Sequence, residues 1–263
     1  MEFMIDGKSA YAYTAGHDID PRKPTVVFIH GAGNDHTSWT QQSRYFAYHG
    51  RNVLSVDLPG HGRSAGPPLD TISRMADWIA AVLDEAKIER AAIVGHSMGS
   101  LVALDFAARH SARADKAVLC GTVVPMPVSQ VLLDAARDDP HRAYDMVNIW
   151  GHAPASYMGA NHFPGLWMMG YYVRLLERNA PDTLYRDFVA CNAFADGFDD
   201  AARVKCPTLL VLGRRDSMTP ANKATELAAR IAGSRTVVIE TSGHALMAEE
   251  PDRVRDELIA FLL

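Results

Sequence analysis

The sequence predicts an α/β protein with a mainly parallel central sheet that helices cover on both faces. Short β-branched, apolar runs alternate with segments of helical periodicity along most of the 263 residues, and such alternation is typical of parallel sheets. The runs at residues 26–29 and 209–212 are continuously apolar, as strands covered on both faces require. We therefore expect both of these strands to lie centrally in the sheet.

The predicted elements follow one another in a regular order. The first residues form an antiparallel edge hairpin that turns at Asp6-Gly7. Pro220 and Pro251 look like first-turn prolines, which places helices at about 220–232 and 251–262. The remaining strands are expected at residues 25–30, 52–57, 91–96, 116–121, 208–213 and 235–240.

Between residues 122 and 203 the alternation of strands and helices stops. Apolar side chains recur at helical spacing within residues 128–136 and again within 168–176. Glycines and prolines interrupt the segment, among them Gly151, Gly159 and Gly165. We therefore predict several short helices joined by turns.

The composition is that of an ordinary globular protein. Apolar residues make up 48% of the chain, charged residues 22%, and the formal net charge is −5. This mild acidity gives no electrostatic basis for binding nucleic acid or an anionic membrane. No apolar run is long enough to span a membrane, the three cysteines show no metal spacing, and the N-terminus does not resemble a signal peptide. We expect a cytoplasmic protein with no cofactor and no metal site.

The motif that carries most chemical information is Gly-His-Ser-Met-Gly at residues 95–99. It places Ser97 at the apex of a sharp turn between a strand and a helix, the arrangement of a nucleophile elbow. Asp216 follows the 208–213 strand, and His244 follows the last predicted strand. A serine hydroxyl needs an adjacent imidazole to accept its proton, and the imidazole needs a carboxylate partner. The order along the chain is therefore nucleophile, acid, histidine.

Together with residues 30–33 and 57–64, these motifs resemble the α/β-hydrolase family from about Thr25 onward. The resemblance implies an α/β-hydrolase fold with Ser97 as nucleophile, Asp216 as acid and His244 as base. An alternative for Asp216 is to cap the helix near residue 220. Since Ser97 is not a carboxylate, relatives with an aspartate nucleophile, the haloalkane dehalogenases and epoxide hydrolases, are excluded.

The resemblance also implies the other parts of the site. The backbone amides of Ala32 and Met98 would form the oxyanion hole. Residues 123–203 would be a helical cap inserted into a core domain of residues 1–122 and 204–263. Methionine and tryptophan suit a broad apolar pocket, and substrate contacts are expected from Trp150, Trp167 and Met168. Further candidates for the pocket wall are Met146, Met158 and Met169.

The predicted activity is hydrolysis of carboxylic esters with small to medium apolar acyl or alcohol groups, through an acyl-enzyme. A small-molecule ester is then the expected partner. Fold alone does not fix the reaction. Thioesterase, lactonase, carbon–carbon bond hydrolase and cofactor-free haloperoxidase chemistry remain open, as does a ligand receptor that keeps the triad without turnover.

Overall fold

The computed structural model describes residues 1–157 and 167–263. The described residues form one eight-stranded sheet in the order β1-β2-β4-β3-β5-β6-β7-β8. The first two pairings, β1 with β2 and β2 with β4, are antiparallel, and the other pairings are parallel. The strands are β1 (Glu2–Ile5), β2 (Lys8–Tyr13), β3 (Thr25–Ile29), β4 (Asn52–Asp57), β5 (Ala91–His96), β6 (Ala114–Cys120), β7 (Thr208–Gly213) and β8 (Arg235–Ile239). The N-terminal hairpin and the mainly parallel sheet are thus confirmed.

The two continuously apolar strands occupy different places in the sheet. β3 lies inside it, between β4 and β5, as predicted. The prediction that β7 is central was wrong, because β7 is second from the edge formed by β8. All six residues of β7 are nevertheless buried, since Leu210 faces one hydrophobic core and Val211 faces the other. A continuously apolar run therefore indicates that both faces of a strand are covered, but it does not indicate that the strand is central in the sheet.

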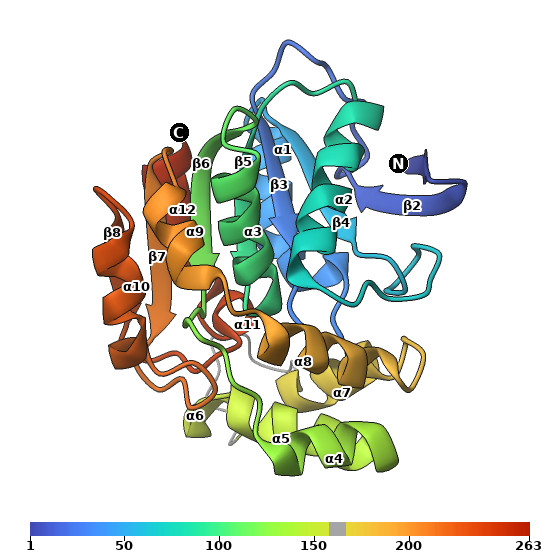
Figure 1. Cartoon of the computed structure of the whole chain (residues 1–263), viewed down its shortest axis with the longest axis vertical. Coiled ribbons are helices and arrows are strands. Elements are labelled where there is room, and N and C mark those ends of the chain that lie inside the picture. The colour runs from blue at the N-terminus through green and yellow to red at the C-terminus, as the bar shows by residue number, and fades with distance from the viewer. Residues whose placement is uncertain (158–166) are drawn as a thin grey trace.

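Helices cover both faces of the sheet (Figure 1). On one face lie α2 (Ile72–Glu85), α3 (Met98–Arg109), α9 (Gly197–Arg203) and α10 (Thr225–Arg230), and on the other lie α1 (Thr40–Tyr48) and α12 (Pro251–Leu262). The helix predicted at 251–262 is confirmed with Pro251 in its first turn. The segment predicted as 220–232 starts with the 3₁₀ turn η2 (Ala221–Ala224), continues as α10, and has Pro220 just before it.

A group of helices follows β6 and lies across the carboxyl ends of the parallel strands (Figure 1). We call the described residues of 128–193 the insertion; its helices are α4 (Gln130–Asp138), α5 (Pro140–Gly151), α6 (Pro154–Tyr157), α7 (Met168–Leu176) and α8 (Thr183–Ala193). The two helices expected at 128–136 and 168–176 correspond to α4 and α7. α9 lies within the predicted cap range of 123–203, but it packs against α3 and α10 beside the sheet.

Three residues named from the sequence, Met158, Gly159 and Gly165, lie outside the described ranges. Within those ranges, no helix is long and apolar enough to cross a membrane. Two short helices lie in the loops near the carboxyl ends of the strands. They are η1 (His36–Trp39), after the loop that follows β3, and α11 (Leu246–Glu249), just after His244.

Candidate active site

Ser97 lies in the turn between β5 and α3, with φ of +52° and ψ of −120°. This backbone conformation is strained for a residue with a side chain. A Cβ at Gly95 would lie 1.9 Å from the carbonyl oxygen of Gly99, and a Cβ at Gly99 would lie 2.5 Å from that of His30. Only glycine fits at both positions, because strand and helix approach so closely. The turn is held further by the Ser97 amide, which donates to the Cys120 carbonyl at 2.9 Å.

Asp216 and His244 come together from the loops that follow β7 and β8. The distance between His244 Nδ1 and Asp216 Oδ2 is 2.8 Å, and both residues are buried. Because a carboxylate can only accept, Nδ1 carries the proton, and Nε2 is left as the basic nitrogen. Ser97 and His244 line the same cavity. The structure therefore brings the three predicted triad residues to one place.

Thr219 is a member of this cluster that sequence reasoning missed. Its hydroxyl donates to Asp216 Oδ2 at 2.6 Å and lies 3.1 Å from His244 Nδ1. The amides of Met218 and Thr219 donate to Asp216 Oδ1 at 2.8 and 2.7 Å. Burial opposes ionisation of Asp216, but the charge and hydrogen bond of His244, with the bonds from Thr219, outweigh it and lower its pKa to about 2. Asp216 Oδ1 thus binds the turn before η2 and Oδ2 pairs with His244, while the alternative that Asp216 caps the helix near residue 220 was wrong, because η2 has no side-chain cap.

One of the two expected oxyanion donors, Met98, follows Ser97 in the chain, and the other, Ala32, lines the same cavity as Ser97. Met98 is the first residue of α3, where backbone N–H groups have no partner within the helix and the helix dipole favours negative charge. Ala32 lies in the loop after β3 and lines the cavity that contains Ser97. In the described part of the chain, neither amide makes a hydrogen bond to the backbone or to a side chain. Both are thus available to a developing negative charge.

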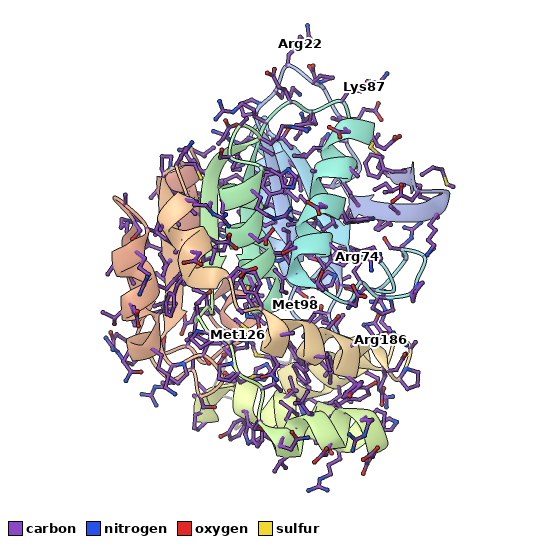
Figure 2. All side chains as sticks on the ribbon, viewed as in Figure 1. Arg22, Arg74, Lys87, Met98, Met126 and Arg186 are labelled. Atoms are coloured by element: carbon purple, nitrogen blue, oxygen red, sulfur yellow. The ribbon has the colours of Figure 1, made fainter. Side chains whose placement is uncertain are left out.

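The cavity beside Ser97 has a volume of about 200 Å³. The insertion contributes apolar walls from Val128, Leu132, Trp150 and Phe188 to this cavity. Met98 and Met126 lie at the junction of sheet and insertion (Figure 2). Among the described lining residues there is no lysine, arginine, aspartate or glutamate. The cavity is therefore apolar apart from the triad and a few hydroxyl groups.

The structure separates the three residues expected to contact substrate. Trp150 lines the cavity that contains Ser97. Met168 is buried and instead lines a second cavity, of about 350 Å³, between α1, α7 and α11. Trp167 is 77% exposed. Composition alone had selected these residues, and composition does not indicate which face of a helix a side chain occupies.

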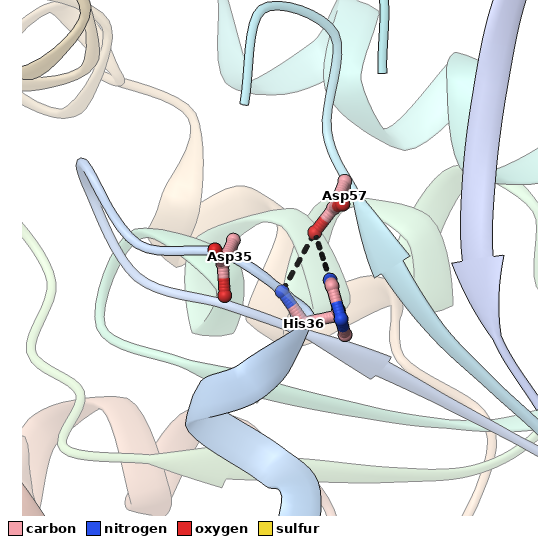
Figure 3. Close-up of side chains that lie close together, drawn as sticks. All are labelled: Asp35, His36 and Asp57. Atoms are coloured by element: carbon pink, nitrogen blue, oxygen red, sulfur yellow. Dashed lines mark hydrogen bonds and ion pairs between the residues drawn. The ribbon is translucent and has the colours of Figure 1, made fainter. Parts of the chain in front are cut away.

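Asp35, His36 and Asp57 form a compact cluster in which one potential ligand atom from each lies within 4.8 Å of the others (Figure 3). The amide and Nδ1 of His36 both contact Asp57 Oδ1, at 2.7 and 2.8 Å. Asp35 Oδ1 accepts from the amide and hydroxyl of Thr37, and Asp35 Oδ2 pairs with Arg178. These contacts join η1 to the end of β4 and to the insertion.

Comparison with known proteins identifies the family. Residues 26–257 match the model of the alpha/beta hydrolase family. The chain belongs to this family. A putative carbamate hydrolase of Pseudomonas syringae pv. syringae is 30% identical, with 91% of this chain and 93% of that protein covered. A 2-hydroxy-6-oxononadienedioate/2-hydroxy-6-oxononatrienedioate hydrolase of Paraburkholderia phymatum is 28% identical, with 94% and 89% covered.

Solved structures show the same fold. The crystal structure of the enol-lactonase from Burkholderia xenovorans LB400 has a TM-score of 0.88 and 24% identity, over 100% of this chain and 99% of that one. The relatives named above are hydrolases of different bonds. The present hydrolase therefore shares the general activity of its family, and its substrate class has to be argued from its own site.

Proposed function

We propose that this hydrolase cleaves small, uncharged carboxylic esters through an acyl-enzyme on Ser97. The observation that carries the proposal is the buried His244–Asp216 contact of 2.8 Å, in one cavity with the strained Ser97. Strain at the elbow holds the nucleophile in one orientation, and Asp216 fixes the tautomer that leaves Nε2 basic. This arrangement suits acyl transfer, because a neutral serine is activated only as it attacks.

The reaction follows from these positions. Ser97 Oγ attacks the ester carbonyl while His244 Nε2 takes the hydroxyl proton, and the imidazolium is stabilised by Asp216. The carbonyl oxygen gains negative charge and is met by the amides of Ala32 and Met98, each worth about 3 kcal/mol of barrier in comparable sites. His244 then protonates the departing alcohol. Water, activated by the same imidazole, releases the acid.

The cavity supports a small substrate. Its volume of about 200 Å³ is below the roughly 300 Å³ at which pockets for drug-sized ligands begin. It exceeds only modestly the roughly 150 Å³ of an apolar cavity that holds benzene. We therefore expect a preference for acyl chains of about two to four carbons.

The lining also supports an uncharged substrate. The relative from Paraburkholderia is named for a dicarboxylate substrate. Burying a carboxylate requires a cationic or strongly hydrogen-bonding partner, and the described lining offers no lysine or arginine. An ester without a charged group therefore fits this cavity better than a dicarboxylate with a carbon–carbon bond to be cleaved.

A panel of p-nitrophenyl esters from acetate to octanoate tests the proposal, with Ser97→Ala as the inactive comparison. We expect turnover that is highest for the short chains, and covalent labelling of Ser97 by a fluorophosphonate, located by peptide mass spectrometry. Labelling at another serine would contradict the assignment of the nucleophile. Ligand-induced thermal stabilisation without turnover would instead indicate a receptor.

A further inference from the structure

We propose that Asp187, a residue of the insertion, positions the oxyanion loop, which we define as residues 30–35. The inference rests on the proposed function and assigns a further role to the insertion. Besides forming the walls of the cavity, the insertion would set the geometry that stabilises the transition state. Asp187 is a positioning residue in this view, because it acts through the backbone and does not touch the substrate.

The contact that carries the inference is direct. Asp187 lies on α8, its side chain is fully buried, and its Oδ2 accepts from the amide of Gly33 at 2.7 Å. The peptide unit that Asp187 binds is therefore the one between Ala32 and Gly33. Peptide units are planar, so only the φ and ψ torsions of Ala32 separate this fixed unit from the Ala32 amide that would face the oxyanion. A shift of the Gly33 amide would thus redirect the Ala32 amide.

A buried cation fixes the orientation of the Asp187 carboxylate. His61 Nε2 lies 2.8 Å from the same Oδ2, and His61 Nδ1 lies 3.1 Å from the carbonyl oxygen of Pro59. Both ring nitrogens face acceptors, so both carry protons and His61 is an imidazolium. Burial alone would lower the pKa of His61, but the charge and hydrogen bond of Asp187 raise it. The ion pair holds the carboxylate in place in a site without water contact.

The insertion also holds the other side of Gly33. Asn179 Nδ2 donates to the Gly33 carbonyl at 2.6 Å, and Asn179 Oδ1 accepts from the Gly62 amide at 2.9 Å. Gly33 has φ of +67°, and a Cβ there would lie 2.8 Å from Leu176 and 3.0 Å from Leu184. Both the amide and the carbonyl of Gly33 are thus bound by side chains of the insertion or of its α7–α8 connection. The loop has little freedom to move independently of the insertion.

Substitutions at Asp187 test the inference. With p-nitrophenyl acetate, we expect Asp187→Ala to lower kcat by about 100-fold and to change KM by less than about twofold, because misplaced donors weaken transition-state binding alone. The rate of Ser97 phosphonylation should fall in parallel. Asp187→Asn should recover part of the loss, since its amide oxygen still accepts from Gly33.

Asp200→Asn is the matched control. Asp200 is a buried carboxylate on α9 that pairs with Arg203, as Asp187 pairs with His61, but among the described contacts no hydrogen bond or ion pair joins it to the oxyanion loop. This variant should lose stability and keep wild-type kcat at a temperature where it is folded. If Asp187→Ala does not fold, Asn179→Ala releases Gly33 from its carbonyl side, at the next peptide unit, and should show a selective loss of kcat as well.

Two results would overturn the inference alone: wild-type kcat in folded Asp187→Ala or Asn179→Ala, or a rise in KM with kcat unchanged. Both are distinguishable from failure of the proposed function. If the wild-type enzyme neither turns over esters nor is labelled at Ser97, the proposed function fails, and the role of Asp187 fails with it.

Discussion

Thr219 shows how one hydroxyl group affects the pair formed by His244 and Asp216. It donates to Asp216 Oδ2, the oxygen that also faces His244. A carboxylate that accepts more hydrogen bonds is a weaker base. Thr219 thus helps keep the proton on His244 and Asp216 ionised while the imidazolium forms. Thr219 is a positioning residue for the triad under the proposed mechanism.

The variant Thr219→Val keeps the shape of this side chain and removes the hydroxyl. We expect kcat for p-nitrophenyl acetate to fall about tenfold with KM little changed, since one hydrogen bond to a charged group contributes roughly 1.5 kcal/mol or more. Steady-state kinetics measures this effect. Thr208→Val is the control, because Thr208 is buried at the start of β7 and its hydroxyl donates to the nearby Cys206 carbonyl. Equal losses in both variants would assign Thr219 a general structural role.

The helical pattern of the sequence, unlike its composition, indicates that Asp187 is buried. Within α8, Leu184, Phe188 and Cys191 are buried at helical spacing, and Asp187 lies on the same buried face. A carboxylate on the apolar face of a helix has to find a partner, because burying an unpaired charge is costly. The pattern therefore predicts a buried polar contact. It does not identify His61 and Gly33, which are more than 120 residues away in sequence.

At the scale of elements, α11 connects the insertion to the loop that follows β8 and contains Gly243 and His244. Glu249 Oε2 accepts from the Ala153 amide and the Ser156 hydroxyl at 2.8 and 2.7 Å, while Oε1 accepts from the Gly243 amide at 3.0 Å. The Gly151 carbonyl accepts from the amide of His244 at 2.9 Å. The end of α5 and the segment after it therefore restrain His244, the proposed general base.

Replacing Glu249 by alanine should uncouple these elements. Glu249→Ala leaves two buried amides and a hydroxyl without their acceptor, so we expect the free energy of unfolding to fall by about 2–4 kcal/mol. Urea denaturation measures the change. Glu240→Ala removes an exposed carboxylate paired with Arg214 and should cost less than about 1 kcal/mol. Similar losses for the two variants would show that Glu249 does not link the elements energetically.

The helices of the insertion should control chain length through Trp150. Trp150→Ala enlarges the cavity beside Ser97, so kcat/KM for the octanoate ester should rise several-fold relative to that for the acetate ester. The control is Val131→Ala, because Val131 is 57% exposed on the outer side of α4. Parallel changes for both esters in Trp150→Ala would show that this wall does not select the acyl chain.

Local signals in the sequence were sufficient for most elements. Pro251 set the start of α12, and Asp6-Gly7 set the turn of the hairpin, because each depends on the backbone preferences of one or two residues. Placement across the sheet depends instead on tertiary packing. The edge-proximal position of β7 and the exposure of Val131 were not predictable from periodicity, which indicates burial but not the order of neighbours.

For the whole molecule, the buried residues His30, His96 and His152 are expected to lower stability in mild acid, whereas the raised pKa of His61 acts in the opposite direction. Burial lowers the pKa values of His30 and His96 to about 3, and it also lowers that of His152. The unfolded chain binds protons at these residues below about pH 6.5, whereas the folded chain does not. The contribution of His30 and His96 to stability should therefore fall as pH decreases below 6.5, by about 1.4 kcal/mol per pH unit for each of the two.

The variant His96→Gln tests this linkage. Between about pH 6 and 4.5, the slope of unfolding free energy against pH should decrease by about 1.4 kcal/mol per unit relative to the wild type. His30→Gln should have the same effect on the slope, whatever its effect on absolute stability. Denaturant titrations at several pH values give these slopes. A slope that neither substitution changes would mean that His30 and His96 bind protons equally in both states.

The contacts of the insertion with the loops around Ser97 limit how the enzyme can be recombined. An exchange of residues 130–193 for the corresponding part of a relative would bring new cavity walls, but it would also remove the Asp187 carboxylate that accepts from the Gly33 amide and the Ser156 hydroxyl that donates to Glu249. A chimaera intended to acquire a new substrate range must therefore keep Asp187, Asn179 and Ser156 in the exchanged segment, so that their contacts with Gly33 and Glu249 are preserved. For engineering purposes, the module to be transferred is the insertion together with the residues that it contacts in the core, and not the helices of the insertion alone.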